Sequence, residues 1–165
     1  MASPFELLLM AQTAQLLPPV TATPNSTTSN GTPTPSGGTE TFDTVLGYYQ
    51  CTLIAGRRYL AVSNGNHGNG TAGELYSMQI RDSGSSSNPT TSSTLIAQSE
   101  WYCPAGGSGG RGIIPLAGSF IASTSGVHTF GVSSLRLVGS NVFTPVPGSL
   151  TGASRELYVM FLGTV

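Results

Sequence analysis

The residues that could carry catalytic chemistry are few and widely spaced in this chain. Its 165 residues include two histidines, His67 and His128, and two cysteines, Cys51 and Cys103. Neither cysteine lies in a recognisable nucleophile signature with a histidine. Four such residues without ligand spacing do not predict a structural zinc site. A disulfide between the cysteines and a pair of buried thiols are both open alternatives.

The acidic residues and glycine-rich segments do not add a catalytic arrangement. Asp82 and Glu100 are the one conceivable glycosidase pair, but the acids mostly resemble solvated strand ends or loop positions. Residues 106–112 lack the Gly-Lys-Ser/Thr ending of a phosphate loop. His67 sits in a polar loop, whereas His128 sits in a strand pattern and is expected to be a hydrogen-bonded sheet histidine. We therefore predict no enzyme, no metal and no cofactor.

Charge is scarce, which excludes several classes of partner. Only 8% of the residues are charged, the net charge is −1, and the six basic residues are scattered arginines. Nucleic-acid binding needs a clustered basic face, so no nucleic-acid partner is expected. The apolar run 7–11 follows no basic residue and is too short to span a bilayer, so no secretion signal or membrane partner is expected.

The first 19 residues are predicted to form a helical arm. Ser3 can cap the helix, Pro4 occupies its first position, and Glu6 completes a capping box. Apolar residues cover most of the circumference, so this helix must be buried against something. Docking on a partner protein, bundling with other copies and folding back on its own domain are the three alternatives. The predicted partner-binding residues are Phe5, Leu7, Leu8, Leu9, Met10, Leu16 and Leu17.

Residues 20–41 are predicted to be a flexible linker and residues 42–165 a β module. The linker is rich in Pro, Thr and Ser and has no hydrophobic periodicity. The module alternates apolar and polar residues between glycine-rich breaks. About eight strands without a helix predict an all-β, antiparallel, jelly-roll-like sandwich. Its strands are expected at residues 42–54, 57–64, 73–82, 94–103, 112–123, 126–138, 140–145 and 156–163.

The last predicted strand is apolar on both faces, which is unusual for a two-layer sandwich. One face packs in the core, so the other needs a further cover, either another subunit or the glycine-rich loops. The first alternative predicts an oligomer interface at Leu157, Tyr158, Val159, Met160, Phe161 and Leu162.

A ligand-binding tip is the alternative use of the module. Trp101 precedes the glycine-rich segment that carries Arg111, and aromatic rings can stack on sugars. His67 lies in another predicted loop. The competing interpretation of Trp101 is core packing.

Several segments of the module resemble a β domain of structural proteins in tailed bacteriophages that infect actinobacteria. The resembling segments are residues 56–59, 73–82, 94–99, 118–122, 125–130, 135–139 and 157–163. The family comprises capsid decoration (minor capsid) proteins, head fibres and tail-fibre tips, which are commonly trimeric.

The resemblance implies a structural virion protein on the capsid exterior, made in the host cytoplasm. It would be a homotrimer. The arm lies outside the resembling segments, and its binding to the major capsid protein is expected from its apolar sequence. The alternative that the resemblance implies is a receptor- or glycan-binding fibre tip, with a host-surface glycan as partner. It brings no catalytic residues.

Overall fold

The computed structural model describes residues 37–69, 71–104, 111–141, 144–147 and 155–164. Residues 66–69, 111–113 and 144–147 are described by their backbone alone. The described part of the chain is all β, without a helix, which confirms the predicted fold class. The predicted arm, and the linker up to residue 36, lie outside the described residues.

The described residues form eleven strands, and every pair of neighbouring strands is antiparallel. The strands are β1 (Thr41–Phe42), β2 (Tyr48–Leu53), β3 (Arg57–Asn64), β4 (Asn66–Asn69), β5 (Leu75–Asp82), β6 (Thr94–Tyr102), β7 (Arg111–Ile113), β8 (Leu116–Ile121), β9 (Gly126–Val138), β10 (Thr144–Pro147) and β11 (Glu156–Thr164).

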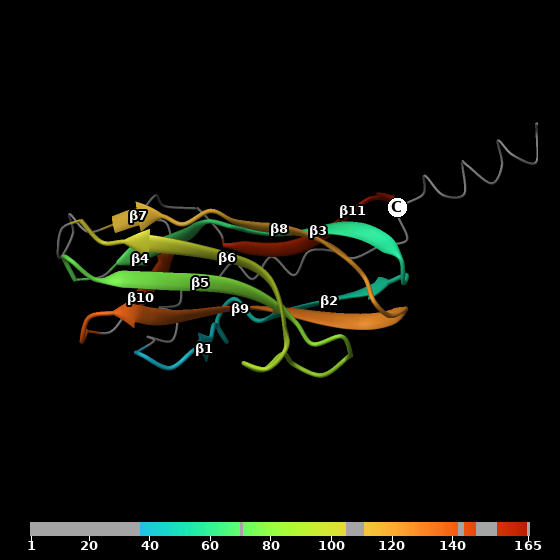
Figure 1. Ribbon diagram of the computed structural model, residues 1–165, viewed down its shortest axis with the longest axis horizontal. Helices are drawn as coiled ribbons and strands as arrows, with labels where there is room; N and C mark the ends of the chain where they lie inside the picture. The colour runs from blue at the N-terminus through green and yellow to red at the C-terminus, as the bar shows by residue number, and fades with distance from the viewer. Residues whose placement is uncertain (1–36, 70, 105–110, 142–143, 148–154, 165) are drawn as a thin grey trace, which may run out of the picture.

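The strands form two packed layers. One layer is the sheet β1-β9-β5-β6, with β2 also paired to β9. The other consists of two three-stranded sheets, β11-β3-β8 and β10-β4-β7. These two follow one another along the molecule, and β9 spans both (Figure 1). The chain crosses between layers from β2 to β3 and from β8 to β9, so the fold is an antiparallel, jelly-roll-like sandwich.

Several predicted boundaries were wrong, among them the strand expected at 140–145, which is β10 at Thr144–Pro147, and two of the differences have a local cause. The expected strand 42–54 is divided because the Asp43 side chain accepts hydrogen bonds from the Val45 and Leu46 N–H groups at 3.1 and 3.0 Å, which makes a turn. The expected strand 112–123 is divided at 114–115, where Pro115 has no N–H for a ladder. Residues 66–69, expected in a loop, pair as β4 with both β7 and β10.

Aromatic side chains from both layers form the centre of the core. Tyr59 of β3 lies 5.8 Å from the Phe120 ring and 5.7 Å from the Phe161 ring, measured between centroids. Phe120 in turn lies 5.7 Å from Phe130 of the opposite layer. Tyr59 and Phe130 are fully buried. Because these rings bridge the layers, they hold the β11-β3-β8 sheet against β9.

The prediction that most acidic residues are solvated was wrong for Asp43, Glu74 and Asp82, which are 5 or 6% exposed. Asp43 forms an ion pair with the buried Arg155, which joins the turn before β2 to the start of β11. Buried charges persist when they are paired and hydrogen-bonded, and removing one partner is strongly destabilising.

Glu40 shows that the β module begins before the expected boundary at residue 42. Its carboxylate receives two hydrogen bonds from Arg81 of β5, at 2.6 and 2.9 Å, and one from the Ser133 hydroxyl of β9 at 2.5 Å. Gly37 accepts the N–H of Arg136. The last residues of the predicted linker therefore pack on the first sheet.

Glu74 fastens the turn that follows β9. Its Oε1 accepts hydrogen bonds from the Ser140 N–H at 2.8 Å and from the N–H and side-chain amide of Asn141, both at 3.0 Å. Its Oε2 accepts the Tyr76 hydroxyl. The Tyr76 hydrogen bond, followed by those from the turn, lowers the pKa of Glu74 from 4.5 to about 2.

We predict that the module loses stability in acid through Glu74. Its pKa is lower in the folded chain, so its contribution is complete above pH 4.5 and is lost as the pH falls toward 2. In urea unfolding, the free energy of unfolding should fall less between pH 6 and pH 3 for Glu74→Gln than for the wild type. The exposed Glu100, changed to Gln, is the matched control and should lose as much stability as the wild type. An equal loss in Glu74→Gln would contradict this assignment.

We also predict that Gly139→Ala is much more damaging than Gly84→Ala. Both glycines have positive φ, 113° and 68°, so each alanine should cost about 1–2 kcal/mol of unfolding free energy. A Cβ on Gly139 would lie 2.3 Å from the Glu74 carboxylate, whereas one on Gly84 meets nothing within 4 Å. Displacing Glu74 should add roughly 1–3 kcal/mol. Equal losses in thermal or urea unfolding would rule out the clash.

Candidate functional site

The outward side of the β11-β3-β8 sheet is the clearest candidate for a functional surface. Alternation along each strand sets its composition, because Tyr59, Leu116 and Leu157 point into the core and their neighbours point out. We call this surface the apolar face. Its apolar residues are Leu60 and Val62 of β3, Ala117 and Ile121 of β8, and Tyr158, Met160 and Leu162 of β11.

The strand register brings these residues into contiguous rows. Val62 lies between Tyr158 and Ala117. Leu60 lies between Met160 and the exposed Ser119, and Ile121 lies opposite Arg58. Ile121 is 50% exposed, Leu162 50% and Met160 42%. Leu60 and Val62 are half-buried by their neighbours. Large contiguous apolar surfaces on soluble proteins mark interaction sites, so this face needs a cover.

The predicted oligomer interface divides into two sets in the structure. Leu157 and Val159 are buried in the core of their own module. Phe161 is half-buried, packs against Tyr59 and receives the Arg57 guanidinium over its ring at 5.4 Å. The outward set is Tyr158, Met160 and Leu162. Sequence alternation identified the two sets, but it could not show that β3 and β8 extend the same face.

Of the three residues of the predicted ligand tip, Trp101 is the one whose side chain the structure describes. His67 lies in β4 and Arg111 in the neighbouring strand β7, where Arg111 pairs with Asn69 and His67 pairs with Ile113. Trp101 is half-buried, stacks on Tyr76 with centroids 5.8 Å apart, and packs against the core. The core-packing interpretation of Trp101 is therefore confirmed.

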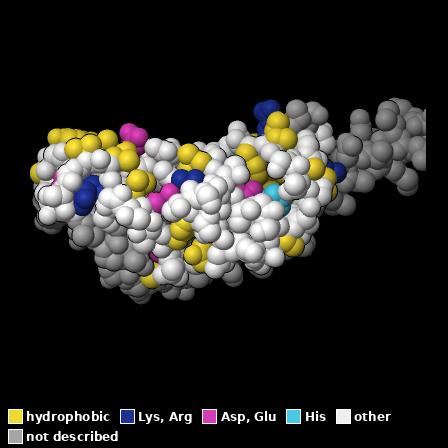
Figure 2. All heavy atoms as spheres, turned by 60° about the horizontal axis from the view of Figure 1, so that its bottom comes forward, with side chains coloured by type: hydrophobic (Ala, Val, Ile, Leu, Met, Phe, Trp, Pro, Cys, Tyr) yellow, Lys and Arg dark blue, Asp and Glu magenta, His cyan; other side chains and the backbone are white. Residues whose placement is uncertain are grey.

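A second group of exposed apolar side chains lies at the end of the molecule where β5, β6 and β9 meet. Tyr102 is 60% exposed and Val138 55%. Leu75 lies between them in the sheet. Figure 2 shows hydrophobic side chains gathered at the left end of this side of the molecule. Simple alternation along β6 would place Leu95 on the same face as Ala97 and Trp101, but Leu95 is 44% exposed because the β5–β6 register shifts after Ile80.

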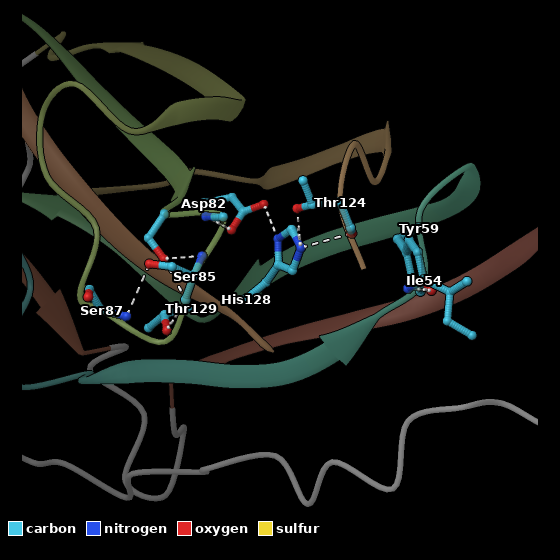
Figure 3. Close-up of polar contacts among 10 residues, drawn as sticks. Ile54, Tyr59, Asp82, Ser85, Ser87, Thr124, His128 and Thr129 are labelled. Atoms are coloured by element: carbon cyan, nitrogen blue, oxygen red, sulfur yellow. Dashed lines mark hydrogen bonds and ion pairs between the residues drawn. The ribbon is translucent and has the colours of Figure 1, made fainter. Parts of the chain in front are cut away.

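A buried polar network joins β5, β9 and the turn before β9. His128 is 1% exposed, and its Nδ1 lies 2.8 Å from Oδ2 of Asp82. Its Nε2 lies 3.2 Å from both the hydroxyl and the main-chain carbonyl oxygen of Thr124. Figure 3 shows the imidazole between Asp82 and Thr124. The prediction of a hydrogen-bonded sheet histidine is confirmed.

Asp82, His128 and Thr124 follow one another as an acid, a base and a hydroxyl would in a catalytic relay. Their hydrogen bonds instead serve to hold the turn before β9 against β5. The ring is enclosed by the sheets and stacks on Phe130. One partner of Nε2 is a carbonyl, which serves to hold the turn in place. Sequence reasoning missed Asp82 as a partner because no local spacing links residues 46 positions apart. Glu100 lies away from Asp82, because in the β5–β6 pairing Asp82 lies opposite Thr94 whereas Glu100 lies opposite Ser77.

The cysteines are free thiols buried in the module. Cys51 lies directly opposite His128 in the β2–β9 pairing. Burial, and then the nearby charge of Asp82, raises the pKa of Cys51 to about 12. A thiol needs to ionise to act as a nucleophile, so Cys51 is unreactive beside its histidine.

Within the described residues, no group of three or more His, Cys, Asp or Glu side chains is arranged to hold a metal ion. The same residues include no helix long and apolar enough to cross a membrane. No known protein family matches this chain, and neither does any curated protein sequence.

We predict that both thiols of the native chain are protected from a disulfide reagent at pH 8. Cys103 is fully buried and Cys51 is 6% exposed with a raised pKa. Ellman's reagent should react with two thiols per chain after denaturation and much more slowly before it. Fast labelling of the native chain that is lost in Cys51→Ser would contradict the assignment of Cys51 as an inert thiol.

Proposed function

We propose that this chain is a structural virion protein that decorates a bacteriophage capsid. The β module would associate with other copies of itself, and the N-terminal arm would bind the lattice of the major capsid protein. The observation that carries the proposal is the apolar face, where β11, β3 and β8 expose one continuous surface. A surface of this kind suits a protein that works in an assembly.

The scarcity of charge supports the same interpretation. With 8% charged residues, and with Glu40, Asp43, Glu74 and Asp82 engaged in internal bonds, little charge is left to keep separate molecules apart. Such a surface suits a protein covered by neighbours. The resemblance to decoration proteins and the apolar sequence of the arm point in the same direction.

Attachment through the arm would gain strength from self-association. A single short apolar helix binds weakly because its burial is offset by the entropy of ordering it. When copies are joined, the first bound arm raises the effective concentration of the next, so the assembly binds far more tightly than one arm. This division gives the module and the arm separate tasks.

The alternative function is a receptor- or glycan-binding tip of a head or tail fibre. Its supporting observation is Tyr102, an exposed aromatic side chain at the end of the molecule that carries β4 and β7. Trp101, the aromatic residue first considered for this task, packs on Tyr76 instead.

We predict that deleting residues 1–17 abolishes capsid binding and leaves the module folded. Capsid shells that lack this protein would be mixed with the full or truncated chain and sedimented. The full chain should sediment with the shells and the truncated chain should remain in the supernatant. Deletion of residues 20–30, which shortens the linker and keeps the arm, is the matched control and should retain binding.

Undiminished capsid occupancy by the truncated chain would refute anchoring by the arm. A full chain that ignores shells but is retained by cell-wall glycan would refute decoration and support the fibre-tip alternative. Circular dichroism of each variant establishes that the β module remains folded.

A further inference from the structure

The apolar face carries opposite charges at its two ends. Arg58 is exposed at the beginning of β3, and Glu156 is half-buried at the beginning of β11. By alternation both lie on the outward side, in line with Leu60 and with Tyr158 respectively. Because β3 and β11 are antiparallel, the beginnings of the two strands lie at opposite ends of the face: Arg58 pairs with Gly163, and Glu156 pairs with Asn64.

A surface with a cation at one end and an anion at the other is complementary to itself. When a second copy is turned end for end and laid on the face, Arg58 of each copy comes opposite the Glu156 end of the other. The rotation is a twofold, so the contact occurs twice. Between these ends the rows are apolar except for Ser119 beside Leu60, and the Leu60 row of one copy meets the Val62 row of the other.

We propose that a second copy of this chain covers the apolar face, with the two β11-β3-β8 sheets packed face to face. In this arrangement β11 lies over β11 with reversed strand direction, and two Arg58–Glu156 pairs flank an apolar centre. Sheets packed in this way lie about 10 Å apart with strands within about 30° of alignment. The charges fix the register, whereas the apolar rows supply most of the affinity.

The described contacts favour a preformed surface for such packing. The Asn64 side-chain amide donates to the Tyr158 hydroxyl at 3.3 Å, which holds the ring beside β3. Arg57 is engaged over Phe161, so Arg58 is the arginine of this pair that remains for an outside partner. A preformed face loses little conformational entropy when it is covered.

The charge pattern also separates a second copy from the chain's own arm as the occupant. Residues 1–19 contain one acid, Glu6, and no basic residue. Glu6 of the arm could form an ion pair with Arg58, but Glu156 would then face an apolar helix. A second copy supplies an opposite charge for both Arg58 and Glu156, which is the reason to assign it this face.

This inference rests on the self-association that the proposed function includes. It replaces the trimer that the resemblance implies with a twofold-symmetric dimer.

Sedimentation velocity of the full-length chain would measure the mass and the dimer dissociation constant. We expect two copies. Arg58→Glu and Glu156→Arg should each raise the dissociation constant about tenfold or more, because each creates two like-charge contacts. The double variant should restore it to within about threefold of the wild type.

Glu100→Arg, an exposed charge change on the other layer, is the matched control and should leave the dissociation constant unchanged. Met160→Glu, which places a charge at the centre of the face without touching the core, should give a monomer with an unchanged circular dichroism spectrum. A mass of three copies, a monomeric wild type, or failure of the double variant to restore association would overturn the inference. Capsid binding by a monomeric chain would leave capsid decoration standing but refute self-association, whereas a dimer that ignores capsids would overturn capsid decoration alone.

Discussion

A strand that is apolar on both sides can bury only one of them inside a two-layer sandwich. This constraint applies to β11, because Leu157 and Val159 lie in the core and Met160 and Leu162 point away from it. The neighbouring strand β3 repeats the pattern with Leu60 and Val62. The interior of the module and its most distinctive surface are therefore two sides of the same three strands. The outer side stays exposed at Met160 and Leu162, which is where we propose that a second copy packs.

The few charges of the chain mainly fasten places where the backbone changes direction. Asp43 and Arg155 join the turn before β2 to the start of β11, and Glu74 holds the turn after β9. Asp82 reaches the turn before β9 through His128. Each of these groups is buried and bonded, so loss of one partner would leave a polar atom without compensation. The protein keeps its turns in place with polar contacts and leaves its sheet faces to apolar packing.

Much of the fold could be predicted from local sequence, because alternation and glycine-rich breaks are local properties. The bounds of β3 and β9 were predicted correctly. The exposure of Leu95 was missed because the register shift depends on the pairing of β6 with β5. The division near Asp43 was missed although its side-chain turn joins residues only three apart. β4 was missed because its residues, rich in Asn and Gly, carry the composition of a loop.

The candidate site was predictable in part for the same reason. The two apolar sides of β11 are visible in its sequence, but the contribution of Ile121 depends on β8 lying next to β3. The Asp82–His128 contact joins residues that no motif connects. Local pattern thus gives the faces of single strands, and the pairing of strands decides which faces merge into one surface.

The contact between Glu40 and Arg81 has a mechanical consequence. The chain enters the module beside a central strand, and the side chains of this ion pair are 9 and 14% exposed. Tension transmitted along the preceding segment would therefore reach β9 through Gly37 and then β5 through Glu40 before it could peel away the two-residue edge strand β1. A load applied through the chain that precedes Glu40 would therefore be shared by the paired strands β9, β5 and β6 instead of falling on the edge of the sheet.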